Sequence, residues 1–189
     1  MVKNKEIKKE TALDDIYRGF RDELVETYVE TGKVEIPALA VIPDGRDGHD
    51  PFVVFPLYDV YVSADANGKI NVNSEQLRAC HSVATEIGSD VAMFISAVPS
   101  RTESEFGVKD ALLLAAKQAD GLTIINLWLK DLEGKDGVLT ESVGHGYESW
   151  TKGPKEDSLE TAVGLALIDA LWTEYILVSR VETLFDDPN

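Results

Sequence analysis

Apolar side chains at steps of three and four residues predict an amphipathic helix over residues 11–31. Thr11 can cap its first turn, where Asp14 and Asp15 favour the positive end of the helix macrodipole, and Gly32 can end it. The positions that form the apolar stripe are Leu13, Ile16, Tyr17, Phe20, Leu24 and Tyr28.

Two hairpins are predicted after this helix. Apolar runs at 36–42 and 51–57 indicate a strand pair around the loop 43–50, and prolines in both runs belong at strand ends or edges because proline lacks an N–H donor. Alternation at 58–62 and 70–72, around the turn signal Asn67-Gly68, predicts the second hairpin.

The middle of the chain predicts a helix and a long buried strand. A capping residue, Asn73 or Ser74, begins the helix, and Gly88 ends it. Residues 90–98 are almost all apolar and predict a buried strand that Pro99 closes.

The segment 110–118 is compatible with a strand or with a short helix, because Ala and Leu favour helices. The β-branched run 122–129, which follows Asp120-Gly121, favours a hairpin.

The last third is predicted to be a glycine-rich loop region and a long helix. Residues 133–156 have room for one strand, around 138–143, and a cap at 157 or 158 begins a helix over 159–185. Its segment 175–181 is also rich in residues that favour strands.

These elements predict a single α+β domain over residues 11–189, with a mostly antiparallel sheet of five to seven strands, an N-terminal amphipathic helix, one middle helix and a long C-terminal helix packed on the sheet. Residues 1–10, with four lysines and two glutamates, are interpreted as a basic N-terminal arm.

Charge narrows the range of partners. The 189 residues contain 34 Asp and Glu against 18 Lys and Arg, a formal net charge of −16. Because nucleic-acid binding depends on basic side chains that neutralise phosphates, direct binding of DNA or RNA is disfavoured.

Cysteine content and hydropathy indicate a cytoplasmic protein. Cys80 is the only cysteine, so no internal disulfide can form. The lysine-rich N-terminus lacks the apolar segment of a signal peptide, and charged residues interrupt the most apolar stretch, 161–185, so we expect no membrane association.

No catalytic or cofactor motif is present in the sequence: there is no G-x-S-x-G, no phosphate-binding loop and no dinucleotide fingerprint. We therefore expect no cofactor. The candidate metal ligands are Asp44, Asp47, His49 and Asp50, whose spacing differs from that of an EF-hand.

Carboxylates recur along the polar side of both terminal helices, and large rings occur in the loop 133–156. In the first helix the carboxylate row contains Asp15, Asp22, Glu26 and Glu30, which are candidate binding residues. Tyr147 and Trp150 are candidate aromatic anchors for a binding partner. Regularly spaced negative charge resembles a phosphate backbone and can occupy a basic groove.

Two functional hypotheses follow. The first is a non-catalytic protein that binds another protein, such as a basic nucleic-acid-binding protein that it inhibits by mimicry, and that self-associates through the apolar C-terminal helix. The second is a small enzyme that uses a divalent metal held by the loop 44–50, His81 and the loop 133–156.

Overall fold

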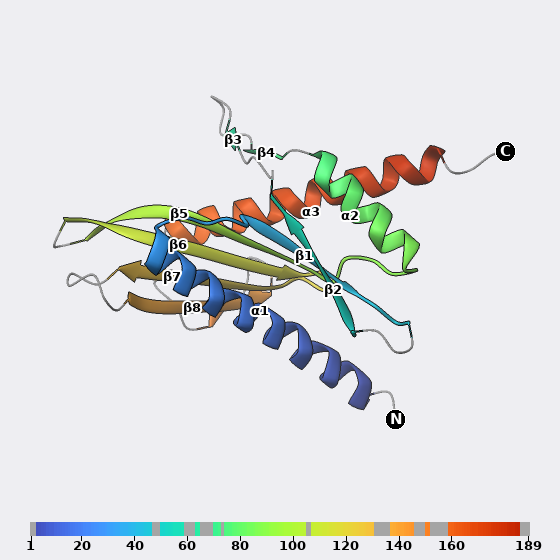
Figure 1. The fold of residues 1–189 in the computed structure, drawn as a ribbon, viewed down its shortest axis with the longest axis horizontal. Coiled ribbons are helices and arrows are strands. Elements are labelled where there is room, and N and C mark those ends of the chain that lie inside the picture. Colours follow the sequence, from blue (N-terminus) through green and yellow to red (C-terminus); the bar gives the residue numbers. More distant parts are fainter. Residues whose placement is uncertain are drawn as a thin grey trace.

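The structure is a computed structural model, and it describes residues 3–46, 50–58, 63–64, 70–72, 74–104, 107–130, 137–145, 150–151 and 159–185. Its centre is an antiparallel sheet of seven strands, with helix α1 on one face and helices α2 and α3 on the other (Figure 1). The single α+β domain that the sequence predicted is confirmed.

The elements follow the chain in the order α1 (Lys3–Thr31), β1 (Ala38–Pro43), β2 (Phe52–Leu57), β3 (Ser63–Ala64), β4 (Ile70–Asn71), α2 (Ser74–Glu86), β5 (Met93–Ser104), β6 (Gly107–Gln118), β7 (Leu122–Lys130), β8 (Gly137–His145), β9 (Trp150–Thr151) and α3 (Leu159–Phe185). The strand order in the large sheet is β2-β1-β5-β6-β7-β8-β9, and β3 pairs with β4 in a separate ribbon. The connection between neighbouring strands β1 and β5 therefore contains β2, the ribbon and α2.

Apolar side chains on both faces of the inner strands explain the three layers. In β6, Leu112 and Leu114 pack on the α1 side, whereas Ala111, Leu113 and Ala115 pack on the α3 side. Because alternate residues of a strand point to opposite faces, a strand that is apolar at every position needs cover on both sides.

Helix α1 begins at Lys3, so the prediction that Thr11 caps it is wrong, and Asp14 and Asp15 do not lie in its first turn. The residues before Thr11 are mostly Lys and Glu, which are good helix formers but provide no apolar stripe. Periodicity therefore missed this part of the helix.

Strand β5 continues through Pro99 to Ser104, so Pro99 does not close the strand as predicted. The N–H of Ala97 donates to the carbonyl of Pro37, and pairing with β1 ends at Ser96. The nitrogen of Pro99 points to the same edge as that of Ala97, beyond the last β1 pair, so the missing donor costs no ladder bond.

The structure decides two alternatives that the sequence left open. Residues 110–118 are strand, because β6 pairs with β7 across a turn in which Gly121 has a φ of 98°. Residues 175–181 are helical, and their buried members, Tyr175 and Val178, lie three residues apart on the face that meets the sheet.

One glycine is required by close packing. A Cβ atom on Gly137 would overlap the indole ring of Trp128, which is 4% exposed, whereas a Cβ on Gly19 in α1 would meet nothing within 4 Å. We expect Gly137→Ala to lower the free energy of unfolding by about 1–3 kcal/mol. Gly19→Ala should raise it by up to about 1 kcal/mol. Urea titrations of the two variants measure both values, and a neutral Gly137→Ala would contradict the packing.

Candidate functional site

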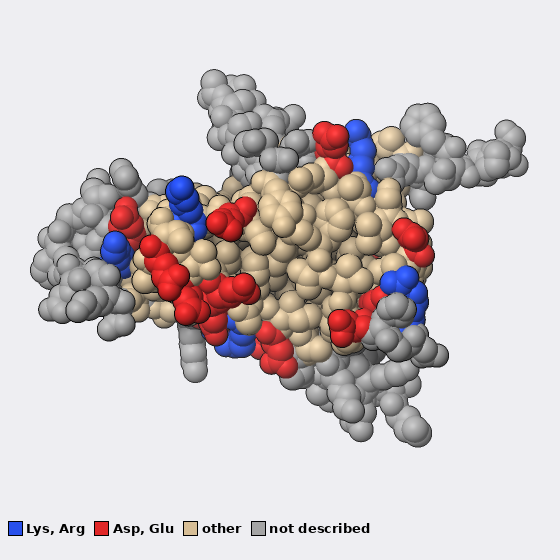
Figure 2. All heavy atoms as spheres, viewed as in Figure 1, with Lys and Arg blue, Asp and Glu red and all other residues tan. Residues whose placement is uncertain are grey.

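Carboxylates outnumber basic residues in the part of α1 from Asp14 to Glu30, where six Asp and Glu occur with two Arg. Buried Leu13, Tyr17, Leu24 and Tyr28 hold one side of the helix on the sheet. This packing directs the predicted binding residues Asp15, Asp22, Glu26 and Glu30 to solvent, and all four are exposed. Figure 2 shows the acidic side chains gathered over the C-terminal half of α1.

A buried polar contact fixes the rotation of α1 on the sheet. The Tyr17 hydroxyl donates to Oδ1 of Asn126 at 2.5 Å, and Nδ2 of Asn126 donates to the carbonyl of Thr140 at 2.9 Å. Burial raises the pKa of Tyr17, so the hydroxyl stays protonated and keeps its donor role. Glu141 lies 3.4 Å from Arg21 and 3.6 Å from Arg18, which ties the helix to β8.

Several of the α1 carboxylates whose side chains are described have no ion-pair partner. Arg18 pairs with Asp14 at 2.9 Å, and Arg21 pairs with Asp22 at 2.7 Å. Within the part of the chain that the structure describes, no ion pair involves the following exposed residues of α1: Asp15, Glu23, Glu26 and Glu30.

The end of α1 concentrates this negative charge. The last turn contains no basic residue, and the carbonyls at this end form the negative end of the macrodipole. Glu26 and Glu30 are four residues apart, so they repel each other as well as the helix end. The acidic row therefore lowers the stability of the helix that carries it.

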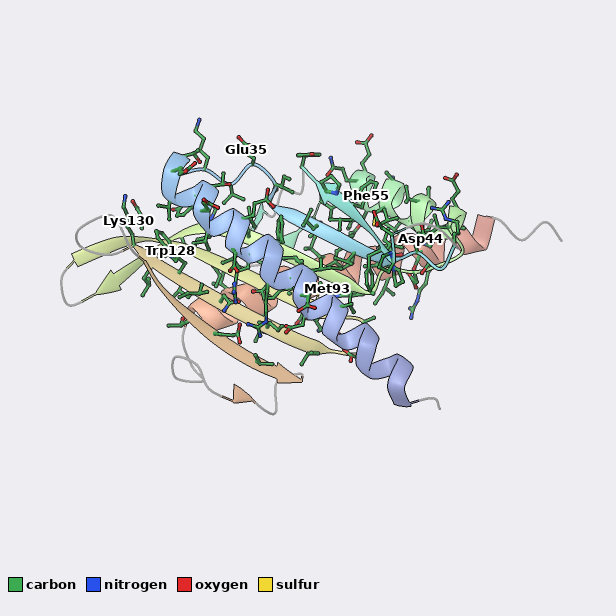
Figure 3. All side chains as sticks on the ribbon, turned by 60° about the horizontal axis from the view of Figure 1, so that its bottom comes forward. Glu35, Asp44, Phe55, Met93, Trp128 and Lys130 are labelled. Atoms are coloured by element: carbon green, nitrogen blue, oxygen red, sulfur yellow. The ribbon has the colours of Figure 1, made fainter. Side chains whose placement is uncertain are left out.

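A groove of about 670 Å³ opens beside the same end of α1. Tyr28 and Trp128, packed edge to face at 5.8 Å, line it together with residues of β5, β6 and β7. Asp110 and Lys130 also line it, and Figure 3 shows Trp128 and Lys130 near this end of the helix. These two charged residues are not among the site residues predicted from the sequence, although the register of a hairpin across Asp120-Gly121 places them opposite each other.

The predicted metal loop is only partly described, and its buried carboxylate has another role. Both oxygens of Asp44 accept hydrogen bonds from the Arg46 side chain, at 2.9 Å from Nε and 2.7 Å from Nη2. The Asp44 side chain is 2% exposed, so it stabilises the hairpin tip. Asp50 is exposed, and Asp47 and His49 lie outside the described residues.

The two histidines within the described residues, His81 and His145, lie on separate elements. Nδ1 of His81 in α2 lies 3.4 Å from the Tyr175 hydroxyl, which donates to Asp90 at 2.5 Å. His145 ends β8, four strands from β1, about 19 Å across the sheet. Among the residues for which side chains are described, no group of three or more His, Cys, Asp or Glu could hold a metal ion.

The remaining predicted binding residues add no further side chain to the acidic surface of α1. Trp150 begins β9, where it pairs with Gly144, and Tyr147 lies outside the described residues. On α3, Asp169 is paired with Lys117 at 2.5 Å and Glu174 is half-buried, so the described carboxylates of this helix form no exposed row like that of α1.

No family model, no curated protein and no solved structure matches the chain. In the described residues, no helix has the length and apolar content that a membrane span requires.

The position of Glu30 gives a test of the helix-end electrostatics. Glu30→Lys removes a carboxylate from the negative end of α1 and creates a favourable pair with Glu26, so we expect stabilisation by about 0.5–1.5 kcal/mol at low salt. Glu75→Lys, in the first turn of α2, should have the opposite sign. Thermal unfolding at low and high salt measures both effects. If the two substitutions shifted the melting temperature equally and in the same direction, the shifts could not be caused by the helix macrodipoles.

Proposed function

We propose that this chain is a non-catalytic binding protein whose acidic α1 face docks on a basic protein surface, of the kind that otherwise holds a nucleic-acid backbone. The observation that carries the proposal is the exposed row Asp15, Asp22, Glu26 and Glu30 on one side of α1. Electrostatic complementarity of this kind increases the association rate and selects basic partners.

The charge density of α1 supports the comparison with a phosphate backbone. Six carboxylates lie between Asp14 and Glu30. This segment is about 24 Å long, so there is one carboxylate per about 4 Å. One strand of B-DNA carries one phosphate per about 3.4 Å of helix axis. Arg18 and Arg21 reduce the net density, mainly near Asp14, Asp22 and Glu141.

The stability cost of the row also supports a binding role. Carboxylates at the negative end of a helix are unfavourable in the free protein, and a basic partner would relieve this repulsion on binding. The expected setting is the cytoplasm, in agreement with a single, buried cysteine, Cys80. No observation on the described residues favours the metal-dependent enzyme.

The test compares two triple variants with the same change in net charge. Asp15→Asn/Glu26→Gln/Glu30→Gln neutralises three carboxylates of the α1 row, and Asp50→Asn/Glu86→Gln/Asp120→Asn neutralises three exposed carboxylates on other elements. The probes are purified core histones and a 20-residue Lys/Arg peptide, with binding measured by fluorescence anisotropy at increasing salt. We expect about tenfold weaker binding for the α1 triple variant, since an exposed ion pair contributes roughly 0.2–1 kcal/mol.

The control triple variant should change affinity less than about twofold. Equal losses in the two variants would show that only bulk charge matters and would exclude α1 as the docking face. Release of a labelled DNA duplex from the histones by the wild-type chain, and not by the α1 triple variant, would support the inhibitory form of the proposal.

A further inference from the structure

Helix α3 exposes large aliphatic side chains on the side that faces away from the sheet. Its inner side packs through Leu165, Ile168, Leu171, Tyr175 and Val178. On the outer side, three large aliphatic residues lie on one line of the helix: Val163 is 41% exposed, Leu177 51% and Val181 49%. Isolated exposed aliphatic residues are common, but a line at helical spacing indicates a contact surface.

The spacing of this line is symmetric about Ala170. Val163 precedes Ala170 by seven residues and Leu177 follows it by seven, and Leu159 and Val181 occupy the positions eleven residues away on each side. Ala166 and Glu174 lie four residues away on each side, so Glu174 is the one departure from the apolar pattern. We call Val163, Ala166, Ala170, Leu177 and Val181 the α3 stripe.

We propose that the α3 stripe binds the α3 stripe of a second copy of this chain in antiparallel orientation, with the two-fold axis at Ala170. A two-fold interface uses the same patch on both subunits, so the patch must complement its own reversed copy. The symmetric spacing meets this condition: Val163 of each copy lies opposite Leu177 of the other. The small side chain at Ala170 lets the helices approach at the axis.

Charge distribution favours a second copy over a basic partner at this surface. Glu174 is the one charged residue on the line of the α3 stripe, whereas the acidic row lies on α1, on the other face of the sheet. Two copies joined through α3 therefore keep their acidic rows on the outer faces. Screening over a Debye length of about 8 Å at physiological salt reduces the remaining repulsion.

The size of the stripe determines how strong the pairing can be. From Val163 to Val181 the helix rises about 27 Å, and a contact about 10 Å wide covers roughly 300 Å² per copy. Stable interfaces bury about 800 Å² per partner. The pairing is therefore a weak, concentration-dependent equilibrium.

Cross-linking with a short bis-maleimide tests the geometry in the full chain. Cys80 is buried, and burial raises its pKa to about 12, so it gives little background reaction. Ala170→Cys should cross-link to itself. Val163→Cys alone should not, because its two copies would be about 21 Å apart along the helix pair. An equal mixture of Val163→Cys and Leu177→Cys should cross-link. Self-linking of Val163→Cys as efficient as that of Ala170→Cys, or no cross-linking at any of these positions, would overturn the antiparallel pairing.

Sedimentation equilibrium on variants provides the second measurement. Leu177→Glu should abolish dimer formation, whereas the control Ile176→Glu, exposed at 42% but about 100° around the helix, should not. Glu174→Ala should strengthen association. A wild-type chain that stays monomeric at millimolar concentration would overturn the proposal.

Salt separates this inference from the proposed function. Binding of the basic probes through α1 should weaken as salt rises, whereas self-association through α3 should hold or strengthen because the like charges of two acidic chains are screened. The α1 triple variant should still dimerise, and Leu177→Glu should still bind histones, so failure of one proposal leaves the other testable.

Discussion

The structure depends on a sheet whose central strands are apolar on both faces. In β6, consecutive residues from Ala111 to Ala116 are all buried, so neither face of the sheet can be left to water. Antiparallel sheets usually expose one face, and the two-sided burial here requires helices above and below. Which side of each helix is free for function follows from this requirement.

The two helix layers meet the sheet differently. On the α3 side the core is mainly aliphatic and aromatic, with Phe94, Trp172 and Tyr175 in edge-to-face contacts. On the α1 side a buried tyrosine and asparagine interrupt the apolar packing. A buried polar pair adds little net stability but penalises any rotation that separates its members, because each would then lack a partner. The Tyr17 and Asn126 pair therefore specifies which side of α1 faces solvent, and with it the direction of the acidic row.

The local parts of the fold could be predicted from the sequence. Alternation of apolar residues, turn residues and helix caps predict four of the elements correctly. These are the strand pair around the loop 43–50, the strand pair around Asp120-Gly121, the helix that begins at Ser74, and the bounds of α3. The start of α1 could not be predicted, because Lys-rich and Glu-rich helix has no apolar period. Three contacts could not be predicted either, because they depend on tertiary packing or on side-chain geometry. They are the pairing of β1 with β5, the hydrogen bond of Tyr17 to Asn126 across 109 residues, and the ion pair of Asp44 with Arg46. The candidate row on α1 could be predicted because exposure follows from the same periodicity that defines the buried side. The groove at Trp128 could not, because it needs the end of α1 and three strands to come together.

The separation of charge and apolar surface between the two faces has a consequence for binding strength. The acidic rows consist of exposed carboxylates, each of which contributes little free energy to an ion pair with a basic partner. A pair of chains joined through α3 would carry two such rows on opposite outer faces, separated by the two sheets and the two α3 helices. Such a dimer can bind two basic surfaces of one partner assembly at the same time only if the distance between these surfaces matches the distance between the two acidic rows. After the first row has bound, the second row is held near its target at a high effective concentration, which a single chain lacks. Weak pairing and weak docking would in this way reinforce each other, without any strong contact at either surface.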